Sequence, residues 1–482
     1  MDIKFDLSQF NSYREDNRCE VKKAHDGLPS SIWETYSAFA NCYGGVIILG
    51  VEEHKDGSWY TSGLQNAPKI MKEFWDVINN RKKVSTNLLK EEDVNIYSHE
   101  GDVIMVIYIP AARRDQKPVY INDDIFGGTY RRNWEGDYHC SRLQVKTMLR
   151  DQADDTVDMT VLDHLEIDVF NADSVKSYRN TFASMKDGHP FLQLDNDEFL
   201  RCIGAAIYVN HVLHPTAAGL LMFGNDYDIV RQFPDFFLDY RAQLDQHKRW
   251  TDRIESSSGD WSGNVFDFYF RVYNKLKQEL RVPFRILDGM RIDDTPMHVA
   301  LREALANCLI NADYYGSRGV VITFSEKCIV LSNPGYSRTG KIQMLLGGIS
   351  DPRNRGLMKM FNLIDIGERA GSGIPKIISS WDNEGFVTPT IEEEYDPDRT
   401  ILTLSLEKKQ AIKASEKELA KQRKSIQTRE KILDYLKENG RSTCIQIAEY
   451  IGLSTTRTRA ILASIEEIEI SGEKKNRTYK IK

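Results

Sequence analysis

The chain has 482 residues, of which 41% are hydrophobic, 28% charged and 10% aromatic. This composition excludes a wholly disordered chain, and the length excludes a single core and predicts roughly three or four domains at about 150 residues each. The net charge of −7 excludes a uniformly basic coat for nucleic acid, although phosphates respond to local patches. Without a run of about 18 uncharged apolar residues or an export-signal pattern at the start, we expect a cytoplasmic protein and no membrane partner.

The seven cysteines show no CxxC spacing. An odd number without paired spacing argues against a disulfide framework and against a thiolate zinc site. We therefore expect reduced cysteines in the core.

The first 150 residues alternate helical and strand patterns. Residues 30–45, SSIWETYSAFANCYGG, have apolar residues at helical spacing and end in Gly-Gly. They lead into the apolar run 46–53, and further strands are predicted at 102–110, 118–124 and 127–134. We expect an α/β or α+β domain over residues 1–150.

Two more domains are predicted before residue 407. Residues 151–290 contain a helical pattern at 195–209 and an extended one at 234–243, which indicates a connecting α+β domain. Residues 291–406 begin with a long helical pattern, 297–315, and continue through strands at 319–325, 327–335 and 400–407. We expect helices packed on one sheet here, and a multidomain α+β protein overall.

The C-terminal residues predict a winged helix-turn-helix after a linker. Residues 407–427 are rich in Lys, Glu, Ala and Gln, as in a solvated helical linker. Within 428–482, helical patterns at 429–439, 443–452 and 454–467 precede a hairpin pattern at 469–482. Three short helices followed by a β-ribbon are the plan of a winged helix.

The third of these helices would enter a DNA groove. Ser454 is a suitable N-cap, and residues 426–482 contain 11 Lys and Arg against 8 Asp and Glu. The alternative is a dimerisation or protein-docking module with a solvated basic face. The candidate nucleic-acid contacts are Thr455, Thr456, Arg457 and Arg459 in the helix and Lys474, Lys475 and Arg477 in the wing.

A polar stripe lies on the predicted helix 297–315. Glu303, Asn307 and Asn311 are spaced i, i+4 and i+8, so their side chains share one side of a helix. Asn307 is a candidate magnesium ligand, and Glu303 is a candidate for orienting or deprotonating a water that attacks a nucleotide phosphate. The alternative is an ordinary solvated face.

Later segments give this stripe a context. The strand-S-N-P-G sequence ends at Gly335, and G-E-x2-G-S-G-I places Gly371 and Gly373 before a predicted helix, where backbone amides can receive phosphates. In this order, E-x3-N-x3-N-A and these two segments resemble the GHKL ATP-binding fold, in the divergent form named after the RecG-like helicase C-terminus, over about residues 290–405.

The GHKL resemblance implies roles for individual residues. Glu303 matches the catalytic Glu and Asn307 the Mg2+-binding Asn, and Gly371 and Gly373 match the glycine-rich nucleotide lid. Asn333 stands where the family has its adenine-reading Asp, and a carboxamide is not a negative acceptor. The implied cofactors are ATP or another nucleotide and a divalent metal. A helicase motor is not implied, because the chain lacks a G-x4-G-K-[ST] sequence.

Acidic residues recur in the first domain. Glu15, Glu20 and Lys22 form E-x4-E-x-K, and Glu52 and Glu53 follow the strand VIILGV. If the strands are neighbours, these carboxylates can hold Mg2+ or Mn2+ for phosphodiester cleavage, with Lys22 steadying the phosphate. The alternative is solvated acids at strand ends.

This acidic pattern, SAFANCYGGVIILGVEE and the later PVY and YRR resemble the AlbA-like domain of Schlafen proteins over roughly residues 5–150. In Schlafen nucleases an acidic triad cleaves tRNA-type RNA, and Glu15, Glu20 and either Glu52 or Glu53 stand where those acids would. The third acid is Asp in the nucleases, and Glu is one methylene longer. Many bacterial relatives with this domain order are described as transcriptional regulators.

Basic and aromatic residues follow in the same domain. Such interleaving suits a nucleic-acid groove, although residues 1–150 carry 20 Lys and Arg against 22 Asp and Glu. The alternative is surface salt bridges. The residues are Arg113, Arg114, Lys117, Arg131 and Arg132, with Tyr120, Tyr130 and Trp134.

Three hypotheses follow. The leading one is a DNA- or RNA-binding regulatory protein with a nucleotide-sensing GHKL-like domain, expected as a homodimer because winged helices commonly bind two-fold sites. The rival is a metal-dependent RNase of bacterial anti-phage defence. The third is a non-catalytic assembly scaffold.

Overall fold

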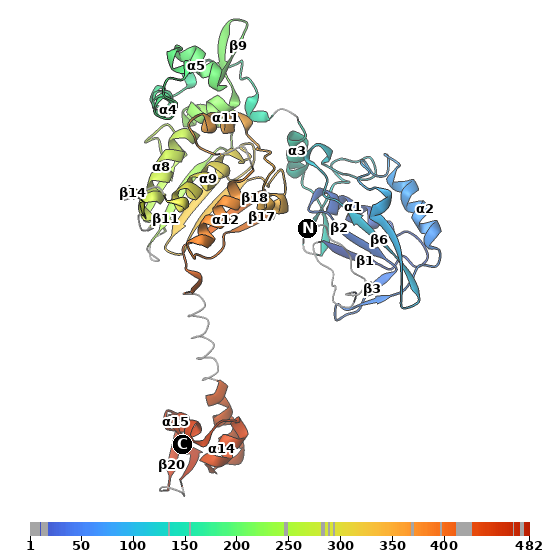
Figure 1. Cartoon of the computed structure of the whole chain (residues 1–482). Helices are drawn as coiled ribbons and strands as arrows, with labels where there is room; N and C mark the ends of the chain where they lie inside the picture. The colour runs from blue at the N-terminus through green and yellow to red at the C-terminus, as the bar shows by residue number, and fades with distance from the viewer. Residues whose placement is uncertain are drawn as a thin grey trace. The chain divides into compact units, whose positions relative to one another are not determined.

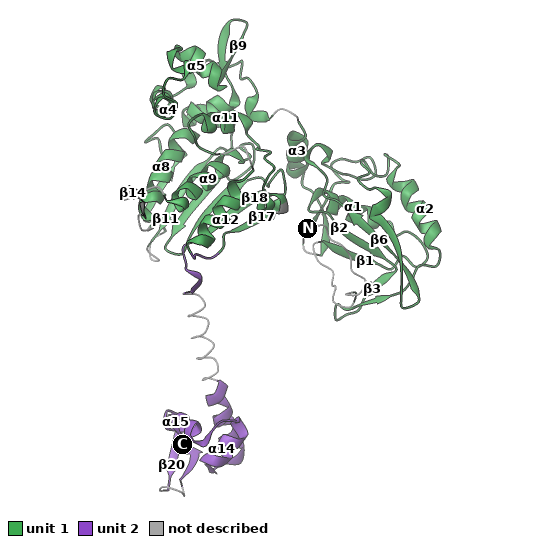
Figure 2. Ribbon diagram, in the orientation of Figure 1, with its two compact units in different colours: residues 1–384, 388–405 green, residues 385–387, 406–482 purple. Residues whose placement is uncertain are grey.

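The computed structural model describes residues 10, 18–133, 135–153, 156–244, 249–280, 285–287, 290–292, 295–367, 371–395, 398–410, 427–465, 467–472 and 477–482. Helices and several separate sheets make it a mixed α and β structure (Figure 1). The chain divides into two compact units, residues 1–384 with 388–405 and residues 385–387 with 406–482 (Figure 2). The predicted α+β multidomain class is confirmed.

The N-terminal part of the first unit is a four-stranded sheet with helices and two small hairpins. Its elements are β1 (Cys19–Lys22), α1 (Ile32–Asn41), β2 (Gly45–Leu49), β3 (Val51–Glu53), β4 (Trp59–Thr61), α2 (Ala67–Ile78), β5 (Val94–His99), β6 (Asp102–Ile109), β7 (Tyr130–Asn133), β8 (Gly136–His139) and α3 (Arg142–Asp151). The strand order is β1-β2-β6-β5, with β1 parallel to β2 and the other neighbours antiparallel.

The central strand β2 explains the apolar run read from the sequence. Ile47 and Leu49 pack in one buried cluster with residues of α1 and α2, whereas Val46 and Ile48 pack in another with Trp59. Successive strand residues face opposite sides of a sheet, so a strand covered on both sides has apolar residues throughout.

The next segment is mostly helical. Its elements are α4 (Ala172–Met185), α5 (Asn196–Ile203), β9 (Ala206–Val209), β10 (Val212–Pro215), α6 (Ala217–Phe223), α7 (Asp226–Gln232), β11 (Leu238–Gln243), β12 (Asp252–Glu255) and α8 (Val265–Glu279). Side chains of Asn171, Asp195, Thr216 and Asn264 accept hydrogen bonds from the first turns of α4, α5, α6 and α8, as N-cap residues do.

The third segment completes a six-stranded sheet. Its elements are β13 (Arg285–Leu287), β14 (Met290–Ile292), α9 (Pro296–Ile310), β15 (Val320–Ser325), β16 (Cys328–Pro334), α10 (Lys341–Leu346), α11 (Arg355–Leu363), α12 (Gly373–Asn383), β17 (Thr390–Tyr395) and β18 (Asp398–Ser405). The order is β12-β11-β15-β16-β18-β17, with only β11 and β15 parallel. Helices α8, α9 and α12 cover one face (Figure 1).

This sheet extends across residue 290, where the sequence predicts a domain boundary. β11 and β12 belong to the segment expected to form a connecting domain, yet β11 pairs with β15 over six residues. The predicted helix 297–315 is shorter in the structure and ends at Ile310, because Asn311 takes a non-helical conformation as its C-cap.

The second unit has the predicted winged-helix order. Residues 427–439 are helical, and they precede β19 (Ser442–Thr443), α14 (Cys444–Ile451), α15 (Thr455–Ala463), β20 (Ile468–Ser471) and β21 (Thr478–Ile481). The strands form a sheet in the order β19-β21-β20. Gly452 takes a φ of +69° at the end of α14, which permits the tight turn into α15.

The remaining described elements are short. The 3-10 helices are η2 (Glu91–Asp93), η3 (Arg114–Gln116), η4 (Val157–Met159), η5 (Ile167–Val169), η6 (Pro190–Gln193) and η7 (Ser256–Ser258). All seven cysteines are free thiols, and five of them are buried.

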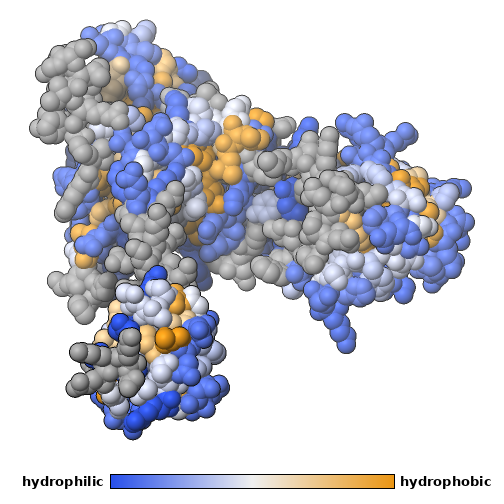
Figure 3. Space-filling model, turned by 60° about the horizontal axis from the view of Figure 1, so that its bottom comes forward, coloured by the Kyte–Doolittle hydropathy of each residue, from blue (hydrophilic) through white to orange (hydrophobic). Residues whose placement is uncertain are grey.

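Among the described helices, none combines the length and apolar character that a membrane crossing requires. Hydrophobic residues appear on the surface as separate patches among hydrophilic ones (Figure 3).

Candidate functional sites

A pocket lies between α9, the ends of β16 and β18, and the start of α12. It contains about 970 Å³ of empty space, counting the part open to solvent. Glu303, Asn307 and Asn311 all line it, as their helical spacing predicts. Asn307 Nδ2 donates to Glu303 Oε1 at 3.1 Å, and Asn311 Nδ2 donates to the Asn307 carbonyl at 2.9 Å.

The strand end beside this stripe brings in Asn333. Its side chain is buried, lines the pocket and donates to the Pro334 carbonyl at 3.2 Å. Gly335 follows with a φ of +82°, and its amide donates to the Asp398 carbonyl at 2.9 Å. Gly335 itself is not among the lining residues, so its role in the structure is to turn the chain.

The two predicted lid glycines also line the pocket. Gly373 begins α12, and a Cβ there would overlap Glu303 Oε1 and lie 2.8 Å from Asn307 Nδ2. Gly371, at a φ of +64°, accepts from the amide of Gly348 at 3.0 Å through its carbonyl. Residues 368–370 lie outside the described part of the chain.

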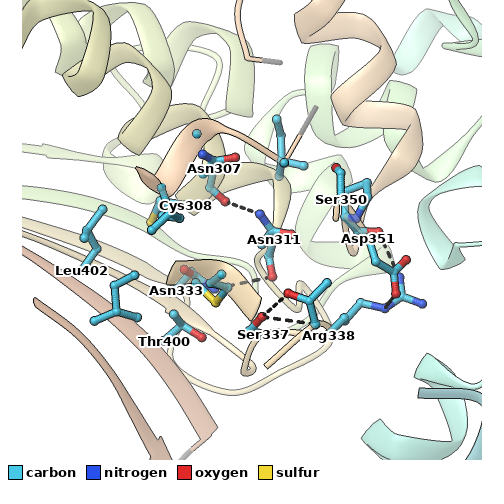
Figure 4. Close-up of a pocket in the computed structure, with 18 of the residues that line it drawn as sticks. Asn307, Cys308, Asn311, Asn333, Ser337, Arg338, Ser350, Asp351, Thr400 and Leu402 are labelled. Carbon is cyan, nitrogen blue, oxygen red and sulfur yellow. Dashed lines mark hydrogen bonds and ion pairs between the residues drawn. The ribbon is translucent and has the colours of Figure 1, made fainter. Parts of the chain in front are cut away.

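Sequence reasoning missed the polar side chains at one end of the pocket. Arg338 is 5% exposed, and burial lowers its pKa to about 10, although Asp151 and Asp351 act in the opposite direction. Figure 4 shows this end, with Arg338, Ser350 and Asp351 lying away from Leu402. The segment 336–353 has no periodic pattern, so nothing in the sequence signalled its place beside α9.

The pocket therefore has different chemistry at its two ends. Leu331, Ile391 and Leu402 supply an apolar wall near Asn333 and Thr400, while hydroxyls and a guanidinium lie at the other end. Glu303 and the carboxamide oxygens of the stripe are hard oxygen donors, which suit Mg2+ when a ligand phosphate completes the coordination. Among the described residues, no group of three His, Cys, Asp or Glu side chains is placed to hold a metal unaided.

The acidic residues of the N-terminal part have basic partners. Glu20, on β1, accepts from Lys22 Nζ at 2.9 Å and from Arg132 Nη2 at 2.7 Å. Glu52, on β3, pairs with Lys23 at 3.2 Å. Glu53 is exposed, and Glu15 lies outside the described residues, so the predicted acidic triad stays a prediction.

The predicted basic surface of this part is largely turned inward. Arg131 and Arg132 are buried, with Arg131 pairing with Asp398 and Arg132 with Glu20 and Asp137. These acidic partners compensate the burial of the guanidinium charges, which is the physical reason for the inward orientation.

The remaining members of this set differ in exposure. Arg114 pairs with Asp351, whereas Arg113 is exposed and pairs with the nearby Asp115. Lys117 Nζ donates to the Asn41 carbonyl at 2.8 Å. Trp134 lies outside the described residues. Only Arg113 matches the expectation of a basic side chain presented openly to solvent.

The winged-helix unit presents its predicted contacts to solvent. Ser454 Oγ accepts from the Arg457 amide and caps α15, as predicted. Thr458 is buried on the opposite side of the helix. Lys474 and Lys475 lie outside the described residues. The exposed predicted residues are Thr455, Thr456, Arg457 and Arg459 on α15 and Arg477 before β21.

Four family models match separate stretches of the chain. They are "Schlafen, AlbA_2" over residues 15–141, "Domain of unknown function (DUF8451)" over 146–239, "Putative ATP-dependent DNA helicase recG C-terminal" over 317–403 and "Winged helix-turn-helix DNA-binding" over 427–468. No curated protein matches the chain.

The solved structures similar to this chain include two from bacteria. The DIP2311 protein from Corynebacterium diphtheriae is 15% identical over 97% of this chain and 92% of its own, with a TM-score of 0.42. The N-terminal domain of a RecG-related ATP-dependent DNA helicase protein from Nitrosomonas europaea is 29% identical over 28% of this chain and 90% of its own, with a TM-score of 0.22. The matching models therefore give the chain a Schlafen AlbA_2 domain, a RecG C-terminal, ATPase-like domain and a C-terminal winged helix, in that order.

Proposed function

We propose that the protein is a nucleic-acid-binding regulator, in which the winged helix contacts duplex DNA and the ATPase-like domain binds a nucleotide. The observation that carries the proposal is the exposed first half of α15. Arg457 and Arg459 face solvent there beside two threonine hydroxyls, while Thr458 and Leu462 hold the helix to its core.

The physical argument for DNA rests on local charge. Residues 426–482 carry 11 basic and 8 acidic side chains in an otherwise acidic protein. Guanidinium groups suit both phosphates and the O6 and N7 atoms of guanine, and a helix of this width fits the major groove. The domain composition is that of a nucleic-acid-binding regulatory protein.

The argument for a nucleotide rests on the pocket. Its volume suits a ligand of that size, and its apolar end near Asn333 can receive a base. Asn307 and Glu303 would hold a divalent cation that neutralises phosphate charge. Glu303 would also take a proton from an attacking water.

The test of DNA binding uses fluorescence anisotropy with labelled duplex DNA. The affinity of the full chain is expected to fall steeply between about 50 and 200 mM salt, because phosphate contacts release counterions. A chain lacking residues 426–482 is expected to lose the binding. Equal affinity of the two chains, or an affinity independent of salt, would refute the proposed role of the winged helix.

A further inference from the structure

The segment 336–353 touches the pocket on one side and the N-terminal part on the other. Arg338, Ser350 and Asp351 line the pocket. Arg114 from the N-terminal part donates through Nε to Asp351 Oδ2 at 3.0 Å. The segment 336–353 therefore lies between the pocket and the contact of Arg114 with Asp351.

The end of α3 forms a second contact with the same segment. Asp151 is the last residue of α3, and its carboxylate accepts from Arg353 Nη1 at 2.5 and 2.7 Å. Its carbonyl accepts from Arg338 Nη2 at 3.1 Å and from Arg114 Nη1 at 2.6 Å. Arg338 and Arg114 thus share one acceptor.

Arg338 is incompletely satisfied in this arrangement. Its Nη1 and Nη2 donate to the carbonyls of Pro352 and Asp151, but its buried Nε has no hydrogen-bond partner among the described residues. The nearest carboxylate oxygen, Asp351 Oδ2, is 3.7 Å away. A buried guanidinium with an unused donor favours an anionic acceptor.

Hydroxyl groups line the pocket together with Arg338. Ser337, Thr339 and Ser350 are among the lining residues, and Ser337 Oγ lies 3.1 Å from Thr339 Oγ1. Hydroxyls beside a guanidinium are suitable donors to phosphate oxygens.

We propose that this end of the pocket is a phosphate subsite built on Arg338, and that a phosphate bound there weakens the contact of the segment 336–353 with Arg114 and α3. The proposal rests on the proposed nucleotide pocket. A phosphate oxygen would take the Nε donor, draw Arg338 from the Asp151 carbonyl and repel the Asp351 carboxylate that Arg114 holds. Ligand binding and docking of the N-terminal part then oppose each other. The same coupling free energy describes the effect of the ligand on the contact and the effect of the contact on ligand affinity.

The first experiment compares ligands by calorimetry in the presence of Mg2+. ATP and ADP are expected to bind the full-length protein more tightly than adenosine. Arg338→Gln is expected to weaken ATP binding by roughly tenfold or more, the scale of a lost hydrogen bond to a charged group, and to leave adenosine binding unchanged. Retained phosphate preference in this variant would overturn the subsite.

The second experiment measures hydrogen exchange in α3 and in residues 113–117. ATP is expected to speed exchange there, and adenosine is not. Arg114 does not itself line the pocket, and Arg114→Gln is expected to speed exchange without ligand and to tighten ATP binding about fivefold. Arg113→Gln is the matched control, because Arg113 is the preceding residue and its exposed side chain pairs with the nearby Asp115.

The outcomes separate this proposal from the proposed function. If no nucleotide or nucleoside binds, the nucleotide pocket itself fails. If ATP, ADP and adenosine bind equally, the phosphate subsite is wrong while a base-binding pocket stands. If ATP binds but neither exchange nor the Arg114→Gln affinity changes, the coupling is wrong. If Arg338→Gln fails to fold, as judged by circular dichroism, the comparison of ATP, ADP and adenosine still tests the phosphate subsite. Arg114→Gln then still tests the coupling.

Discussion

Gly373 packs closely against two side chains that line the pocket. A methyl group there would lie well inside contact distance of Glu303 and Asn307, which are themselves held together by a hydrogen bond. Gly373→Ala is expected to weaken hydrogen-exchange protection of α12 by about 1–3 kcal/mol, the usual range for overpacking.

The matched control for this substitution is Gly27→Ala. A methyl group added at position 27 would meet open space and ordinary backbone angles, so protection of the neighbouring backbone should change little. Protection of α12 that is equal in Gly373→Ala and the parent protein would show that Glu303 moves aside without cost.

Asp158 provides a pH dependence with a definite sign. Burial raises the pKa of this carboxyl above its ordinary value, against hydrogen bonds from Thr156 and from the amides of Leu357 and Gly356. The pKa of Asp158 is higher in the folded state than in the unfolded state. The contribution of this carboxyl to folding stability is therefore fully present below about pH 4 and is lost as the pH rises through the folded-state pKa.

Replacing this carboxyl with an amide should remove that dependence. We expect the stability of Asp158→Asn relative to the parent protein to increase as the pH rises from about 4 towards neutrality, measured by urea unfolding at several pH values. Asp163→Asn, at an exposed position, is the matched control for the substitution itself. A stability difference between Asp158→Asn and the parent that does not change with pH would contradict a raised pKa at this carboxyl.

The RNase hypothesis can be tested at the third acid. It expects cleavage of tRNA by the purified protein with Mn2+, and a loss of at least about 100-fold in either Glu52→Gln or Glu53→Gln, but not in both. Glu52 is the safer site for substitution than Glu20, because it is 27% exposed whereas Glu20 partners the buried Arg132. Uncut tRNA, or full activity in both variants, would refute the hypothesis.

Side-chain positions that depend on nearby residues were predictable from the sequence, and those that depend on partners far away in the sequence were not. The shared face of Glu303, Asn307 and Asn311 follows from helical periodicity alone, so spacing sufficed. The inward orientation of Arg131 depends on Asp398, which lies 267 residues away. Such a distant partner cannot be read from a local pattern.

At the scale of elements, α15 carries the most direct prediction. Replacing Arg457 and Arg459 together with Gln is expected to lower the slope of log affinity against log salt by about 2, because each would remove one phosphate contact. The measurement is anisotropy with duplex DNA at several salt concentrations.

The matched control for the double substitution in α15 is a basic residue on another helix of the same unit. Lys437 is an exposed basic residue of the helix 427–439, and Lys437→Gln should alter the slope less than the double substitution. An unchanged slope in the double variant would place the DNA contact elsewhere, or leave the winged helix as a docking module.

Helices and strands that are marked by nearby capping or turn residues were predictable. The pairing of strands that lie far apart in the sequence was not. The order of helices and strands in 427–482 follows from Thr443, Gly452 and Ser454, which cap or terminate neighbouring helices. By contrast, the six-stranded sheet joins β11 to β15 across α8 and α9. Pairing between segments so far apart is set by packing, so the boundary expected at residue 290 has no counterpart in the sheet.

At the scale of the whole molecule, the second unit has a core of its own. The buried cluster lies entirely within residues 427–482, with Ile432, Leu436, Ile447, Leu462 and Tyr479 among its members. A domain with a closed core can be removed without exposing the apolar interior of another.

A chain ending at residue 410 tests this independence. It retains the whole six-stranded sheet, the pocket and the contact of Lys408 with Phe386. We expect it to keep the ATP affinity of the full chain within about twofold by calorimetry, to lose duplex DNA binding, and to lack one unfolding transition of the full chain in a thermal scan. If removing residues 411–482 changes ATP affinity by tenfold, the two units exchange about 1.4 kcal/mol of coupling, and the winged helix must then be treated as part of the nucleotide response.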